Sequence, residues 1–200
     1  MPSERVLYFP CRRAYSVHMA ATDLITAEQF ERMGGLGRWV ELDRGVVVRV
    51  KPPGFPHGEI AVAIAARLHA FVQPRGLGTV AVESGYTLAR NPDSVRGPDV
   101  SFVRRERVED VGGTGYLAGA PELAVEIRSP RDSVADLALL EGEYLAAGAH
   151  LVWIVDPESA TVQLHAPGVA SRTLTGPDAL DGGTLLPGFA MPVAEVFAAA

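Results

Sequence analysis

Hydrophobic and polar positions follow a helical period in three parts of the chain. Two capping-box pairs, in which a hydroxyl residue is followed three positions later by an amide or an acid, indicate where helices begin: Thr26 with Gln29, and Ser133 with Asp136. The second pair predicts a helix over residues 134–147. Between the two, one stripe of apolar residues recurs at helical spacing and predicts a long helix that ends near Gln73: Ile60, Ile64, Leu68 and Phe71.

Elsewhere the apolar residues alternate or run continuously, as they do in β-strands. The runs WVELD and VVVRV flank Arg44-Gly45 and predict a hairpin. LVWIVD is continuously apolar, which is typical of a central strand covered on both faces. Further strands are predicted at the runs TVAVES, GYTLAR, PDVSFV, ELAVEIR and TVQLHA.

The order of these elements predicts a single α/β domain, with one mixed sheet flanked by helices, and excludes a uniform βαβ repeat. A chain of 200 residues, 48% of them hydrophobic, is long enough to bury a core of this kind. Residues 1–22 show no clear period, so we expect an N-terminal extension followed by a domain over residues 23–200.

Composition excludes several classes of function. The net charge of −6 argues against bulk electrostatic coating of nucleic acid. The sequence contains no membrane-spanning run and no signal peptide, so we expect a cytoplasmic protein without membrane partners. A single cysteine excludes an internal disulfide, and phosphate-loop, zinc-protease and esterase motifs are absent.

Two acids occupy positions where a carboxylate is costly to bury. Asp99 precedes the apolar run of PDVSFV, and Glu126 lies within ELAVEI. If the two strands are neighbours, both carboxylates converge at one end of the sheet. Such a pair suits Mg²⁺ or Mn²⁺, which activates water and offsets the charge that develops on a phosphodiester. The residues alone leave open a plainer interpretation, in which Glu126 pairs with Arg128 and Asp99 is a turn residue.

Three blocks of sequence surround these acids: SVRGPDVSFV, GYLAGAPELAVEIRSPRDS and EYLAAGAHLVWIVDPE. Their succession closely resembles the Uma-type family, described as putative restriction endonucleases, within the PD-(D/E)XK nuclease superfamily. The resemblance extends from Thr26 to the C-terminal LLPGFAMPV segment. It implies a restriction-endonuclease-like α/β core in which acids at strand ends hold a divalent metal.

The resemblance also implies roles for individual residues. Asp99 matches the metal-binding aspartate and Glu126 the second acid. Glu41 and His57 match positions at which the family places a glutamate and a histidine near the site. For His57 the alternative is a loop histidine at a helix start, and for Glu41 it is a solvated strand acid.

The sequence departs from the family pattern at the lysine. Arg128 stands two residues beyond Glu126, and Leu140 occupies the position on the following helix where similar members keep their lysine. Leu140 shares a helical stripe with Tyr144, so it is expected to face inward. Arginine keeps a charge but practically never releases its proton. The only lysine, Lys51, lies in the loop after the hairpin.

Two functions from different classes follow. The first is a Mg²⁺-dependent endonuclease of DNA, in which Arg128 supplies charge and a homodimer cuts both strands. The second is a catalytically degenerate protein that keeps the fold as a DNA-binding or interaction module. A small-molecule hydrolase has nothing specific in its favour. For either of the first two, a cluster of arginines offers a phosphate-binding surface: Arg90, Arg96, Arg104, Arg105 and Arg107.

Overall fold

The computed structural model describes residues 24–33, 36, 39–109, 115–130 and 132–198. The expected N-terminal extension, residues 1–22, lies outside this part of the chain.

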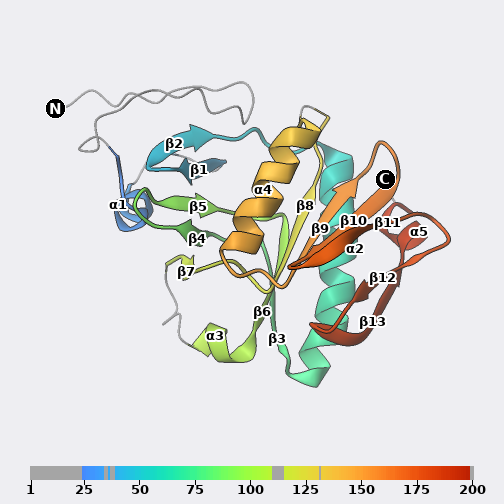
Figure 1. Cartoon of the computed structure of the whole chain (residues 1–200). Helices are drawn as coiled ribbons and strands as arrows, with labels where there is room; N and C mark the ends of the chain where they lie inside the picture. Colours follow the sequence, from blue (N-terminus) through green and yellow to red (C-terminus); the bar gives the residue numbers. More distant parts are fainter. Residues whose placement is uncertain (1–23, 34–35, 37–38, 110–114, 131, 199–200) are drawn as a thin grey trace.

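A six-stranded mixed sheet forms the centre of the molecule (Figure 1). Strands β8 and β9 are parallel, and every other pair is antiparallel. In spatial order the strands are β11 (Val169–Leu174), β10 (Thr161–Ala166), β9 (Leu151–Asp156), β8 (Leu123–Ile127), β6 (Val100–Arg104) and β3 (Gly78–Val82).

Helices cover both faces of this sheet. Alternate residues of β8 point to opposite faces, so Val125 joins the core under α2 (Phe55–Val72), whereas Ala124 joins the core under α4 (Val134–Ala146). This burial on both faces explains the continuous apolar run of β9, and it confirms the predicted helix-flanked α/β fold. Both capping boxes are formed, and the second one begins α4 as predicted.

A five-stranded sheet lies beside the first. It packs against the short helix α1 (Ala27–Arg32), whose Phe30 is buried with Leu42 and Val95. The predicted hairpin at Arg44-Gly45 is present, and both residues have the positive φ of a tight two-residue turn. The strand order is β2 (Val46–Arg49), β1 (Val40–Asp43), β5 (Ser94–Arg96), β4 (Tyr86–Ala89) and β7 (Leu117–Ala118).

The C-terminal part extends the core beneath α2. The hairpin of β12 (Ala179–Gly182) and β13 (Leu186–Pro192) leads into α5 (Val193–Val196), and their apolar side chains join the α2 core. Two short helical segments complete the described chain: a 3₁₀ turn at Gln73–Arg75 after α2, and α3 (Arg105–Glu109) after β6.

The expectation of a single sheet was wrong, because the described residues form three. The missed strands lack the alternation on which the prediction rested. Strand β5 has only three residues, and two of them are polar yet buried. Strand β13 contains Pro187 and Gly188, which are typical of loops.

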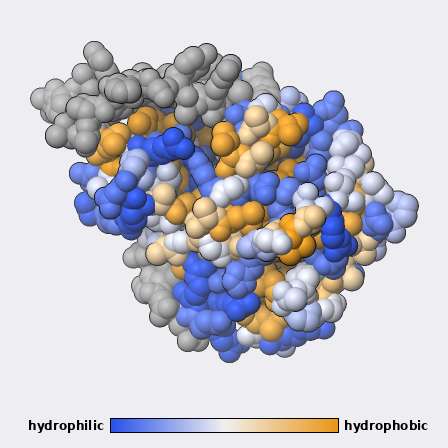
Figure 2. Space-filling model, in the orientation of Figure 1, coloured by the Kyte–Doolittle hydropathy of each residue, from blue (hydrophilic) through white to orange (hydrophobic). Residues whose placement is uncertain are grey.

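On the face that α4 covers, apolar residues form separate patches among polar ones (Figure 2). Within the described residues, no helix has both the length and the hydrophobicity needed to cross a bilayer.

Candidate active site

Three acids occupy equivalent positions on three adjacent strands. Val100 of β6 lies opposite Val82 of β3 on one side and Val125 of β8 on the other. The next position toward the same end of each strand is an acid: Glu83, Asp99 and Glu126. The predicted convergence of Asp99 and Glu126 at one end of the sheet therefore follows from the register.

Asp99 is held by both its neighbouring strand and α2. Its Oδ2 accepts a hydrogen bond from the backbone N–H of Ile127 at 2.6 Å, and lies 3.3 Å from Nε2 of His57. Its side chain is only 14% exposed. The carboxylate is thereby fixed at the end of β8 and is not a solvated turn residue.

His57 lies in the first turn of α2, directly after a loop that Pro52 and Pro53 keep out of the helix. Its Nε2 is 3.0 Å from the carbonyl oxygen of Ile127. Because that oxygen can only accept, Nε2 carries the proton. Burial by itself would lower the pKa of His57, but the hydrogen bond and charge of Asp99 outweigh it and raise the pKa above its ordinary value.

Glu126 is buried and faces α4. The hydroxyl of Tyr144 donates a hydrogen bond to its Oε1 at 2.7 Å. Tyr144 belongs to the buried stripe of α4 together with Leu137 and Leu140, so the inward orientation expected of Leu140 is confirmed.

Arg128 is directed to the end of β9, so the interpretation in which it is the partner of Glu126 was wrong. Its Nη1 is 2.9 Å from Oδ2 of Asp156 and 3.5 Å from Oε2 of Glu158. Burial alone would raise the pKa of Asp156, but Arg128 and neighbouring hydrogen-bond donors lower it overall.

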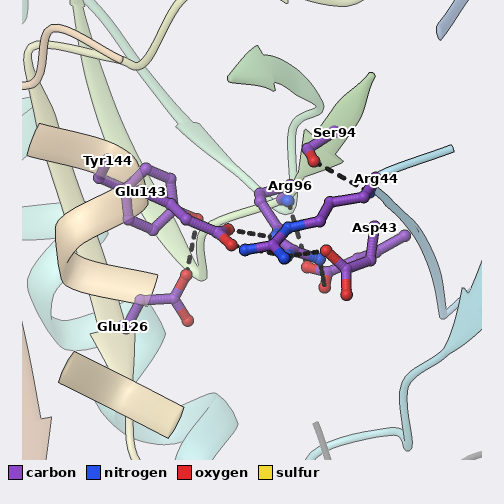
Figure 3. A network of polar contacts seen from close by, with 9 residues as sticks. Asp43, Arg44, Ser94, Arg96, Glu126, Glu143 and Tyr144 are labelled. Carbon is purple, nitrogen blue, oxygen red and sulfur yellow. Dashed lines mark hydrogen bonds and ion pairs between the residues drawn. The ribbon is translucent and has the colours of Figure 1, made fainter. Parts of the chain in front are cut away.

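Arg96 is the centre of a buried ionic network that Asp43 and Glu143 share (Figure 3). Its Nε is 2.8 Å from Glu143 of α4, and its Nη2 is 2.9 Å from Asp43 of β1. A longer contact of 3.4 Å joins Nη1 to Glu41. Burial opposes the charged form of Arg96, but these carboxylates outweigh it and raise its pKa. Glu41 is thus a buried partner of Arg96 and not a solvated strand acid.

The predicted phosphate-binding arginines do not form one surface. Arg96 is buried and paired, which corrects its assignment as a nucleic-acid contact. Arg104 and Arg105 lie at the opposite end of β6 from Asp99, roughly 17 Å away at the rise of an extended strand. Arg90 and Arg107 each form ion pairs within the protein.

Sequence reasoning missed two residues of this site, Tyr144 as a partner of Glu126 and Glu83. The helical period placed Tyr144 on the inner face of α4 but did not indicate a partner for its hydroxyl. Glu83 has a positive φ of 51°, its N–H donates to the carbonyl of Pro98, and its charge helps to raise the pKa of His57. No local pattern marks the end of β3 as part of a site.

A hard divalent cation that keeps most of its water needs few ligands from the protein. No cluster of three or more His, Cys, Asp or Glu side chains able to hold a metal occurs among the described residues. Mg²⁺ commonly takes only one or two protein carboxylates, and water and substrate phosphate fill its other positions. At this end of the sheet the carboxylates that such an ion would use are Asp99, beside His57 of α2, and Glu126, beside Tyr144 of α4.

A mixed sheet between two helices, with acids at the ends of adjacent strands, defines an α/β fold with an acidic candidate site at one end of the sheet. The sequence matches the Uma2 family model, described as "Putative restriction endonuclease", over residues 27–194, and the chain belongs to this family. The fold is similar to that of a putative nuclease of DUF820 from Anabaena variabilis, with a TM-score of 0.75 and 20% identity. That match covers 87% of this chain and 98% of the other. Among curated proteins, no relative matches the sequence.

The Arg96 network should contribute strongly to stability. Arg96→Gln leaves buried carboxylates without their cation, and we expect it to lower the free energy of unfolding by about 3–5 kcal/mol in urea titrations. The control is Arg105→Gln, at an exposed position, which should change it by less than about 0.5 kcal/mol. Equal effects of the two substitutions would show that the network has no special role.

Proposed function

We propose that this protein is a metal-dependent endonuclease that hydrolyses phosphodiester bonds of DNA. One observation carries the proposal: Asp99 and Glu126 occupy adjacent positions on paired strands, and each is oriented by a hydrogen bond from another element. Membership of a family described as "Putative restriction endonuclease" supports the same reaction class.

Asp99 and Glu126 are the residues that would hold Mg²⁺ or Mn²⁺. A bound cation of this kind lowers the pKa of water and neutralises charge on the phosphate. The protein's own contribution is orientation. His57 and the Ile127 amide fix Asp99, and Tyr144 fixes Glu126, so neither carboxylate has to be ordered when substrate binds.

Arg128 is the candidate for electrostatic support of the transition state. Its guanidinium lies at the same end of the sheet, beyond the end of β8, but it is shared with Asp156 and Glu158. A cation already paired with carboxylates stabilises new negative charge less than an unpaired one does. We therefore expect slow catalysis.

The second candidate function is a catalytically degenerate module that binds DNA or another partner. The observation in its favour is Leu140, which is buried one helical turn before Tyr144. A lysine at that position would lie on the face of α4 from which Tyr144 reaches Glu126, whereas leucine carries no charge there. For the active form, we propose a homodimer in the cytoplasm, because two symmetric sites can cut two strands.

Cleavage of supercoiled plasmid with Mg²⁺ or Mn²⁺ tests the proposal. We expect the parent protein to nick the plasmid, and Asp99→Ala and Glu126→Ala to lower the rate by about 100-fold or more, since metal-assisted charge stabilisation contributes several kcal/mol. Glu195→Ala removes an exposed acid on α5 and should leave the rate unchanged. Parent activity that survives in both site variants would contradict the assignment.

Restoring the missing lysine separates the two candidate functions. We expect Leu140→Lys to raise the cleavage rate by about 10-fold or more, because a fixed cation near the phosphate lowers the barrier electrostatically. Leu140→Met keeps an apolar side chain of similar volume and serves as the control. If neither the parent nor the lysine variant cleaves DNA, the binding-module function is favoured.

A further inference from the structure

Three arginines gather at the end of the six-stranded sheet opposite the acids, where α3 and the last turn of α2 lie (Figure 1). Arg104 ends β6, Arg105 begins α3, and Arg75 ends the 3₁₀ turn that follows α2. Arg75 and Arg105 are exposed, and Arg104 is half-buried. We call these three residues the basic end.

Strand pairing and side-chain packing bring the three arginines into one surface. Arg104 lies opposite Gly78 in the ladder of β3 and β6. The guanidinium of Arg105 lies directly against Gly76, in the space that a Cβ at this glycine would occupy, and Gly76 is the next residue after Arg75. The segment from Arg75 to Gly78 therefore borders both Arg104 and Arg105, and the basic end is continuous.

No ion pair with another described residue consumes the positive charge of the basic end. The carbonyl oxygen of Phe71 accepts a hydrogen bond from Arg75 at 3.0 Å, and the ring of Phe71 lies 4.0 Å beneath the guanidinium. Arg104 contacts the imidazole of His150 at 3.4 Å. These partners hold the side chains in place without neutralising them. By contrast, Arg128 near the acids is paired with carboxylates.

Acids near the basic end offset only part of its charge. Glu122 is buried, and Arg107 neutralises it at 3.0 Å. Glu106 is exposed and opposes three guanidinium groups. Glu109 and Asp110 follow along the chain, with side chains outside the described residues, so their effect is measured in the full chain below.

A hollow of about 480 Å³ leads along β3 from the basic end toward the acids. Thr79 lines it at the basic end, Ala81 lies further along, and Ser84 lines it next to Glu83. The one charged side chain among its described lining residues is Glu31. The distance along β3 is roughly 17 Å at the rise of an extended strand. Since phosphates of one DNA strand follow at about 3.4 Å along the helix axis, this distance corresponds to about five nucleotides.

We propose that the basic end binds the phosphate backbone of DNA about five nucleotides from the phosphate at the acid pair, and so anchors the substrate along β3. This inference rests on the proposed function and specifies how its substrate is held. Guanidinium groups match the geometry of phosphate oxygens. On a chain with a net charge of −6, a local group of arginines confines the contact to one place.

Fluorescence anisotropy with a labelled duplex of about 20 base pairs, in EDTA and over a range of salt concentrations, measures this contact without cleavage. We expect Arg75→Gln/Arg105→Gln to lower the slope of log Kd against log salt concentration by about 1.8, because each phosphate contact contributes about 0.9. Arg75→Lys/Arg105→Lys should keep the slope of the parent. The matched control, Arg44→Gln/Arg172→Gln, removes two exposed arginines elsewhere and should also keep it.

Plasmid cleavage with Mg²⁺ distinguishes an anchor from a catalytic residue. Because the basic end is remote from the acids, it stabilises bound substrate and transition state equally. We expect Arg75→Gln/Arg105→Gln to raise KM by about 5-fold or more and to leave kcat unchanged. Glu106→Gln removes an opposing acid and should lower KM.

An unchanged salt slope in Arg75→Gln/Arg105→Gln would overturn the inference and would show that the surrounding acids neutralise the basic end. An equal loss in the matched control, or failure of the parent to bind the duplex at low salt, would also overturn it. If the parent never cleaves but the slope falls as expected, the catalytic proposal alone fails. If Asp99→Asn abolishes cleavage while the arginine variant keeps its slope and KM, the anchoring inference alone fails.

Discussion

Arg96 lies buried among Glu41, Asp43 and Glu143, and this ion cluster joins the five-stranded sheet to α4. A buried guanidinium is costly unless several carboxylates surround it. Here the carboxylates come from β1 of the five-stranded sheet and from α4 on the six-stranded sheet. The charge that would otherwise destabilise the core therefore fixes the two sheets and the helix relative to one another.

The acid pair lies next to the same cluster along the chain. Asp99 follows Arg96 by three residues, and the intervening Gly97 amide is 3.5 Å from Glu41. Glu143 and Tyr144 are consecutive on α4, so the residue that binds Arg96 and the residue that orients Glu126 share one helical turn. A displacement of α4 would thus disturb the Arg96 cluster and the orientation of Glu126 at once. In this fold, stability and the geometry of the site have a common origin.

Residues with a clear period or motif allowed most of the central fold to be predicted. The capping boxes, the Arg44-Gly45 hairpin, the apolar β9 and the inward Leu140 all depend on local chemistry, and all were confirmed. The placement of Asp99 beside Glu126 required only that two predicted strands pair. Sequence alone could not reveal that Arg96 is buried, because an arginine among carboxylates from β1 and α4 has no local signature. Glu83 was missed for a similar reason, since only strand register brings it beside Asp99.

Calorimetric titration with Mn²⁺ tests the central claim, that Asp99 and Glu126 form a divalent-metal site. The account predicts that each chain of the parent protein binds one Mn²⁺ ion. Asp99→Asn, an isosteric change that removes the charge of the carboxylate, should abolish that binding. The control variant Glu195→Gln should retain it. An Mn²⁺ affinity in Asp99→Asn equal to that of the parent would contradict it.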